Sequence, residues 1–187
     1  SGTFRSPELV GLILFNRHRF IGNRNGNDGG GSGVWVNNML DEENIYNVFV
    51  EFAYTDFINN SSPNNGGAYG VGIQSYVKQT ELAFFFCNFI GNHCDGSEGG
   101  GALWVRTSSN CIISDCLFQD NYVSKEKASN GGAIYLSFTS ESIIMDISYT
   151  TFINNSCSNP GSKGHAVYST LLYGVIETYD SIFTDNG

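Results

Sequence analysis

Three Asn-x-Ser sequons carry the best-defined chemistry in this sequence, because asparagines in that context accept glycans in secreted eukaryotic proteins. They begin at Asn59, Asn60 and Asn154, and the first two overlap. Asn60 belongs to a repeated motif whose asparagine we expect to point inward, whereas Asn59 and Asn154 should point outward by strand alternation. The sequence therefore predicts glycans on Asn59 and Asn154, and less readily on Asn60.

Aromatic residues form a second group of candidates, since flat apolar rings suit contact with sugar rings. The candidate sugar-contacting aromatics each follow a glycine-rich motif and are Trp35, Trp104, Tyr135 and Tyr168. They alternate with a mostly aliphatic set made of Val34, Tyr69, Leu103, Ile134 and Val167. We expect the aliphatic set to face the core, which leaves an aromatic stripe on the surface, broken at Gly70.

Carboxylates, histidines and cysteines show no arrangement typical of an active site. The acidic residues are scattered, as at Asp56, Asp95, Glu98, Asp115, Asp120 and Asp146. Calcium-assisted lyases and glycosidases need such groups clustered or paired. His93-Cys94-Asp95 and His165 are more simply solvated loop residues than metal ligands. The sequence predicts no catalytic residues, no metal and no cofactor.

The composition of the chain excludes several classes of protein. The chain has 187 residues, a net charge of −9, 14% charged residues and 23 glycines. Such an acidic chain is not a typical nucleic-acid binder, and its glycine content argues against a helical bundle. The longest apolar runs, Leu9 to Phe15 and Leu82 to Cys87, are far shorter than the roughly 18 residues of a membrane-spanning helix.

Two motifs recur in step along the chain. The first is Phe-x-x-Asn, with its phenylalanines at Phe20, Phe57, Phe89, Phe118, Phe152 and Phe183, and its asparagines at Asn23, Asn60, Asn92, Asn121, Asn155 and Asn186. Successive phenylalanines are 37, 32, 29, 34 and 31 residues apart. The second motif is close to Gly-Gly-Ala-Ile and follows each of the first five copies, as at Gly131-Gly-Ala-Ile-Tyr-Leu136.

The repeating unit is built from short strands. Segments such as Asn44 to Phe52, Asn110 to Phe118 and Ser142 to Ile147 are β-branched or aromatic and lie between Gly, Asn and Ser residues. A unit of this length buries its apolar face only by stacking on its neighbours. We predict an all-β parallel β-helix of about five to six coils. It forms a single domain over residues 1–187, either complete or a segment of a longer solenoid.

Stacking places equivalent residues above one another at roughly 4.8 Å. The motif phenylalanines should then form an internal aromatic column, and the motif asparagines an amide ladder at a turn. Cys87 and Cys116 fall at the same register in adjacent coils, two residues before their phenylalanines. They form either a buried thiol pair or a disulfide.

The paired motifs resemble the repeats of the chlamydial polymorphic outer-membrane protein family, from about Phe20 to Asn186. The resemblance implies a right-handed parallel β-helix at the cell surface or outside the cell, often with an adhesive role. The first and last glycine-rich motifs depart from the family pattern, reading Gly31-Ser-Gly-Val and Gly164-His-Ala-Val.

The leading hypothesis is a non-catalytic extracellular structural or adhesive protein. It would be a glycosylated rod that stacks end to end with copies of itself or with further β-helix segments, and that contacts glycans or cell-surface molecules. Ser1 to Asn25 carries four arginines and one glutamate, giving +3, and Glu177 to Gly187 carries three acids, giving −3. Opposite charges at the two ends favour such stacking. The alternatives are a carbohydrate-binding module and a pectate-lyase-like enzyme that degrades polysaccharide.

Overall fold

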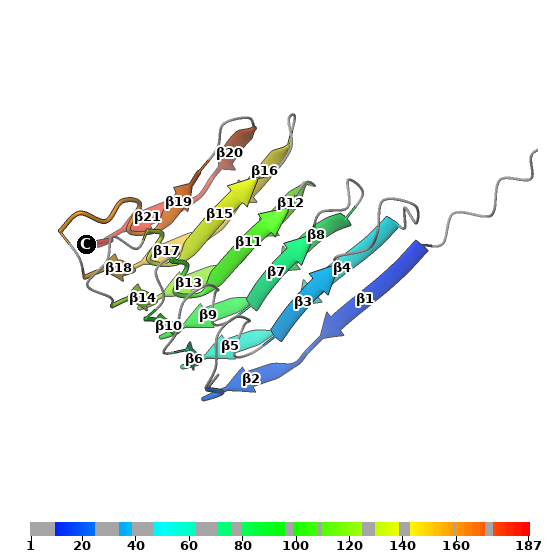
Figure 1. Cartoon of the computed structure of the whole chain (residues 1–187), viewed down its shortest axis with the longest axis horizontal. Coiled ribbons are helices and arrows are strands. Elements are labelled where there is room, and N and C mark those ends of the chain that lie inside the picture. The colour runs from blue at the N-terminus through cyan, green and yellow to red at the C-terminus, as the bar shows by residue number, and fades with distance from the viewer. Residues whose placement is uncertain are drawn as a thin grey trace, which may run out of the picture.

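The chain winds into a stack of short parallel strands, each paired with its counterpart one repeat away (Figure 1). The computed structural model describes residues 10–24, 34–38, 47–62, 71–75, 80–95, 99–107, 110–124, 130–138, 143–158, 160–170 and 174–187. No helix occurs within these ranges. The predicted all-β parallel solenoid is therefore confirmed.

Two sheets have six strands each. Sheet A contains β1 (Val10–Asn16), β4 (Asn47–Ala53), β8 (Thr80–Phe85), β12 (Cys111–Ser114), β16 (Ile144–Ser148) and β20 (Val175–Tyr179). Sheet B contains β2 (Arg19–Ile21), β5 (Asp56–Ile58), β9 (Asn88–Ile90), β13 (Leu117–Gln119), β17 (Thr151–Ile153) and β21 (Ile182–Thr184). The turn between these sheets is called the A–B corner below.

The other two sheets are smaller. Sheet C contains β6 (Ser61–Ser62), β10 (His93–Cys94), β14 (Tyr122–Val123) and β18 (Ser156–Cys157). Sheet D contains β3 (Val34–Asn38), β7 (Val71–Ser75), β11 (Leu103–Thr107), β15 (Ile134–Phe138) and β19 (Val167–Ser169). Four successive coils contribute a described strand to every sheet, whereas the first contributes to three sheets and the last to two. The number of complete coils is slightly below the predicted five to six.

The motif phenylalanines form one continuous column. Neighbouring rings are stacked with centroids 4.5 to 5.1 Å apart, from Phe20 to Phe183. The four inner rings are 0% exposed. Burying a phenylalanine contributes roughly 1.5–3 kcal/mol, so this column is a main source of the stability of the stack.

A second phenylalanine column, which the motif did not indicate, lies beside the first. Phe15, Phe52 and Phe84 stack at 4.6 and 5.1 Å, and Ile113 and Ile147 continue the same register. Its rings meet the first column edge-on, at centroid distances of 5.6 to 6.1 Å. Interlocked columns of this kind fill the core with few gaps.

The motif asparagines form the expected ladder at the turn after sheet B. From Asn23 to Asn155, each side-chain Nδ2 donates to the Oδ1 of the asparagine one coil further on, at 2.9 to 3.0 Å. From Asn60 to Asn186, it also donates to a phenylalanine carbonyl of the preceding coil, at 2.8 to 3.1 Å. The four inner asparagines are fully buried, and the ladder meets the requirement that buried polar groups be hydrogen-bonded.

Two details differ from the sequence predictions. The run Asn110 to Phe118 is not one strand, because the backbone turns at Asp115 (φ 54°) between β12 and β13. In the second coil, Val71 pairs with Leu103, and Gly72 pairs with Trp104. The predicted partners Tyr69 and Gly70 lie outside the described residues. A shift of two residues keeps the same face inward, so the alternation of the sequence did not reveal it.

Candidate functional site

The sequon residues lie at the B–C corner, the turn between sheets B and C. Asn59 and Asn154 are exposed, as predicted, and both have φ of 52°. The Asn154 Nδ2 donates to Asp120 Oδ1 at 2.6 Å. Asn60 is 0% exposed and holds the ladder, so a glycan there would require the coil to open. The geometry leaves Asn59 and Asn154 as the accessible sequon asparagines.

Every described coil uses a left-handed residue at the B–C corner. The six residues with positive φ there are Gly22, Asn59, Gly91, Asp120, Asn154 and Asp185. Gly, Asn and Asp are the types that tolerate this conformation best. The sequons thus arise at a position where asparagine is already favoured by the backbone.

The predicted aromatic stripe on sheet D is wrong at its centre. Leu103 and Ile134 are buried in the core as expected, and Val34 and Val167 pack against it. Trp104 points to the opposite side of the sheet, but only 3% of it is exposed. Strand alternation decides which face a residue lies on, but not whether that face is covered. Tyr135 and Tyr168 are half-buried, and the Trp35 side chain lies outside the described residues.

The two register-matched cysteines are free thiols. The Cys87 backbone N–H donates to Cys116 Sγ at 3.4 Å, and both thiols contact strand carbonyls. Thr55 and Thr150 occupy the same position in the neighbouring coils and make equivalent hydroxyl–carbonyl bonds. Burial raises the pKa of the Cys116 thiol well above its ordinary value. The position is structural and favours a small hydrogen-bond donor.

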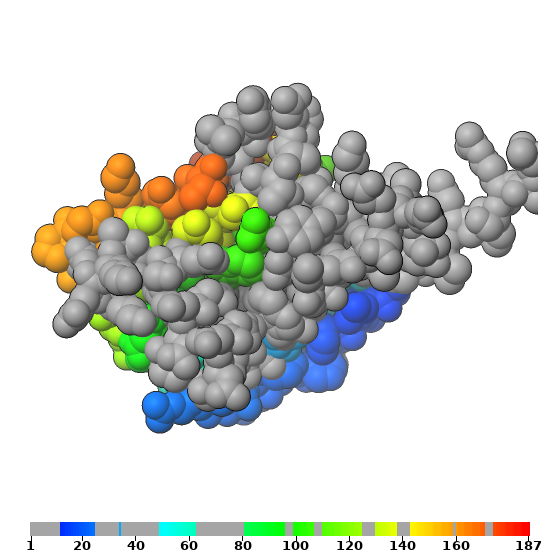
Figure 2. Space-filling model, viewed as in Figure 1, coloured from blue at the N-terminus to red at the C-terminus, as the bar shows by residue number. Residues whose placement is uncertain are grey.

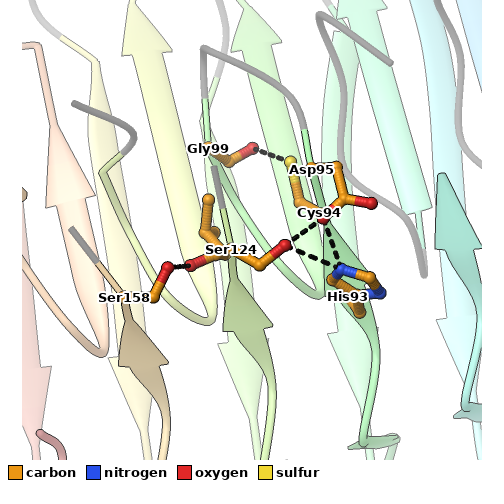
Figure 3. Close-up of polar contacts among 7 residues, drawn as sticks. His93, Cys94, Asp95, Gly99, Ser124 and Ser158 are labelled. Atoms are coloured by element: carbon orange, nitrogen blue, oxygen red, sulfur yellow. Dashed lines mark hydrogen bonds and ion pairs between the residues drawn. The ribbon is translucent and has the colours of Figure 1, made fainter. Parts of the chain in front are cut away.

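A Ser–His–Asp cluster lies on sheet C (Figure 3). His93 Nε2 is 2.7 Å from Asp95 Oδ1 and 3.1 Å from Ser124 Oγ, and Ser124 Oγ also contacts Asp95 Oδ1. The imidazole stacks on Tyr122 with ring centroids 4.2 Å apart. The expectation that His93-Cys94-Asp95 is a solvated loop is wrong, because His93 and Cys94 form β10 and Cys94 is 0% exposed. Ser124 was not singled out in the sequence, because it lies one coil away in the stack.

The cluster lacks the geometry of a serine hydrolase. A catalytic histidine binds its carboxylate through one ring nitrogen and takes the serine proton through the other. Here a single nitrogen faces both partners. Across the described ranges, no three His, Cys, Asp or Glu side chains are grouped closely enough to hold a metal ion.

An exposed aromatic column at the A–B corner was not predicted. Six residues with φ between 45° and 58° follow one another along the stack, namely Arg17, Tyr54, Phe86, Asp115, Tyr149 and Asp180. The three aromatic side chains are 46 to 61% exposed. Each of the six lies three residues before a motif phenylalanine, which is the signal that the sequence contained for this column.

The fourth coil also links the protein to a known repeat. Residues 115–137 match the Chlamydia polymorphic membrane protein repeat. The match runs from the A–B corner through β13 and β14 into β15, and so contains both motifs of this coil. The resemblance seen in the sequence is therefore confirmed for a polymorphic membrane protein-type repeat.

No curated protein and no solved structure matches the chain. Within the described residues, no helix is long and apolar enough to cross a membrane.

Proposed function

We propose that the protein is a non-catalytic surface scaffold: a β-solenoid rod located at the cell surface or outside the cell, with an adhesive or structural role. The observation that carries the proposal is that the phenylalanine column and the asparagine ladder run unbroken from the first coil to the last. The matched repeat, named for a membrane protein, supports the surface location. A continuous ladder of this kind makes a rigid support on which corners and loops present their side chains.

We further propose that the ends of the stack accept additional coils, from another copy or from elsewhere in the same protein. Phe183 is 47% exposed at one end, and Phe20 ends the column at the other. In each ladder bond the donor lies on the earlier coil and the acceptor on the later one. The last coil therefore presents N–H donors of Asn186 to an added coil, and the first coil presents the Oδ1 acceptor of Asn23. Arg17 and Asp180 occupy the same corner position at opposite ends. Added coils thus meet matching rings, hydrogen bonds and charges.

Negative-stain microscopy tests end-to-end stacking. Six coils span roughly 29 Å along the axis at roughly 4.8 Å per coil, so stacked copies form rods that are multiples of this length. Phe183→Glu places a charge on the end face and should shorten the rods. Ile112→Glu adds the same charge to the outer face of sheet A and serves as the matched control. Compact single particles from both variants and from the unmodified protein would reject stacking.

Glycosylation of Asn59 and Asn154 belongs to the same proposal. Both side chains project from the B–C corner, in the second and fifth coils, and are exposed. Intact mass of native material, measured before and after enzymatic deglycosylation, should show a loss that Asn59→Gly and Asn154→Gly each reduce. An unmodified native mass rejects this part of the proposal and leaves the scaffold role unaffected.

A further inference from the structure

The A–B corner holds bulky residues where the fold does not require them. The B–C corner meets the same left-handed backbone requirement entirely with Gly, Asn and Asp. The A–B corner places Tyr54, Phe86 and Tyr149 at this position instead. Left-handed backbone disfavours such side chains by roughly 1–2 kcal/mol per residue. These rings are largely exposed, and burial in the core does not offset that cost.

The surface beside this corner is acidic and apolar. The carboxylates on the outer side of sheet A and at the corner are Glu51, Glu81, Asp115, Asp146, Glu177 and Asp180, and none forms an ion pair with another described residue. Arg17 is the single arginine or lysine of the described sheet A strands and this corner. Exposed apolar side chains lie among them, at Leu12, Leu14, Phe49, Ile112, Ile144 and Val175. A surface of this composition is complementary to a cationic partner.

One cation–π contact already occurs at this corner within the chain. The Arg17 guanidinium lies over the Tyr54 ring, 5.9 Å from its centroid. Tyr54 in turn stacks on Phe86, with centroids 4.9 Å apart and an interplanar angle of 5°. The other face of Phe86 is therefore turned toward the fourth coil, where Asp115 stands. The next residue of the column is the aromatic Tyr149.

Coil spacing sets the room between these two rings. Phe86 and Tyr149 are two coils apart, or roughly 10 Å, so a cation midway is roughly 5 Å from each ring. Cation–π attraction operates within roughly 6 Å of a ring centroid. The short Asp115 side chain, which accepts a hydrogen bond from Ser114 Oγ at 2.8 Å, supplies the carboxylate between the rings.

We propose that the A–B corner binds an arginine side chain of a partner protein between Phe86 and Tyr149, with its guanidinium on Asp115. The inference names the partner chemistry of the adhesive role proposed above and rests on that role. Arginine fits better than lysine because its planar guanidinium stacks on aromatic rings while it pairs with a carboxylate. The apolar and acidic outer side of sheet A then contacts the rest of the partner segment.

Fluorescence anisotropy with two labelled peptides of equal charge tests the site on the whole chain. One peptide contains four Gly-Ser-Arg units and the other four Gly-Ser-Lys units. We expect tighter binding of the arginine peptide, and roughly tenfold weaker binding after combined Phe86→Asn and Tyr149→Asn substitution. Asparagine tolerates the left-handed backbone, so the thermal midpoint of the double variant should be unchanged or higher. Equal affinity for both peptides, or unchanged binding by the double variant, overturns the proposal.

Two matched substitutions distinguish binding at the A–B corner from general electrostatic attraction of a cationic peptide to an acidic protein. Asp115→Asn and Asp185→Asn each remove one exposed charge from a left-handed corner residue with φ of 54° or 51°. We expect weaker binding of the arginine peptide only for Asp115→Asn. Equal losses would show diffuse electrostatic attraction and reject the site. Rods that still form without selective peptide binding would overturn the corner site alone, whereas corner binding by compact single particles would overturn end-to-end stacking.

Discussion

Neighbouring asparagines in this chain have opposite surroundings. Asn154 is exposed and left-handed at the B–C corner, whereas Asn155 is 0% exposed and lies in the ladder. The Oδ1 of Asn155 accepts from the backbone and side chain of Asn121, and its Nδ2 donates to Asn186 and to the Phe118 carbonyl. The role of an asparagine here is set by its place in the coil.

Asn155→Ala should therefore lower the free energy of unfolding by about 3 kcal/mol, because it leaves buried donors and acceptors in two neighbouring coils unpaired. Asn154→Gly, one residue earlier, should change it by less than about 0.5 kcal/mol, since glycine tolerates positive φ. Urea denaturation of both variants measures the difference. Equal losses would show that the ladder bonds add nothing beyond local backbone effects.

The buried thiols give the protein a defined response to alkaline pH. Burial raises the pKa of Cys111 to about 12 and that of Cys157 to about 11. The unfolded chain loses these protons near pH 8.5. The contribution of these two thiols to the free energy of unfolding is therefore fully present below this pH. It is lost as the pH rises toward the pKa values of the folded protein.

We expect the urea midpoint to decrease from pH 8 to pH 10.5, and to decrease less in a Cys111→Ala, Cys157→Ala double variant. The comparison is made within each protein across pH, so the cost of removing the thiols cancels. Identical pH dependence of the two proteins would contradict the thiol assignment and point to tyrosine or lysine ionisation instead.

Among the elements, the strands of sheet B depend most on one residue each. Each three-residue strand contributes one ring to the phenylalanine column. Phe118→Ala removes a fully buried ring between Phe89 and Phe152, and should cost about 4 kcal/mol because the stacked neighbours cannot fill the cavity. Phe183→Ala at the exposed end should cost about 1 kcal/mol. Thermal unfolding of both variants checks the ratio, and similar costs would contradict the argument that burial between two stacked rings makes Phe118 the more stabilising residue.

The elements also show which features the sequence could predict. The phenylalanine column and asparagine ladder followed from two motifs in step, because parallel stacking converts a repeat spacing directly into contacts. The second column did not, since Phe15, Phe52 and Phe84 give way to Ile113 and Ile147. Any apolar side chain of suitable size satisfies that register, so no single residue type marks it.

For the candidate sites too, the sequence predicted the features that depend on the repeated motifs and missed those that depend on other contacts. The exposure of Asn59 and Asn154 was predicted because it depends only on one neighbouring ladder residue. Burial of Trp104 was not, because strand alternation assigns a residue to a face of the sheet but does not tell whether that face is covered. The aromatic residues of the A–B corner were missed because tyrosine and phenylalanine are typical of strands, and their left-handed backbone is not encoded in residue type.

At the scale of the whole molecule, the stack behaves as a one-dimensional array. Each described strand pairs only with its neighbours along the axis, in an order that runs evenly from one end to the other (Figure 1). The colours on the surface follow the same order, from blue at one end toward orange at the other (Figure 2). Stability in such an array is the sum of unit and interface terms, so units with a single neighbour open first.

Amide hydrogen exchange should reveal this gradient and report on stacking in the same experiment. In dilute protein, the amides of β9 and β13 should exchange most slowly and those of β2 and β21 most rapidly, because the end strands have one pairing partner instead of two. At concentrations where rods form, protection of β2 and β21 should rise while that of β9 and β13 stays constant, since only the end strands gain a neighbour. Phe183→Glu should abolish this rise without altering the central strands. Uniform exchange along the stack at every concentration would show that the coils unfold as one unit and that their ends remain free.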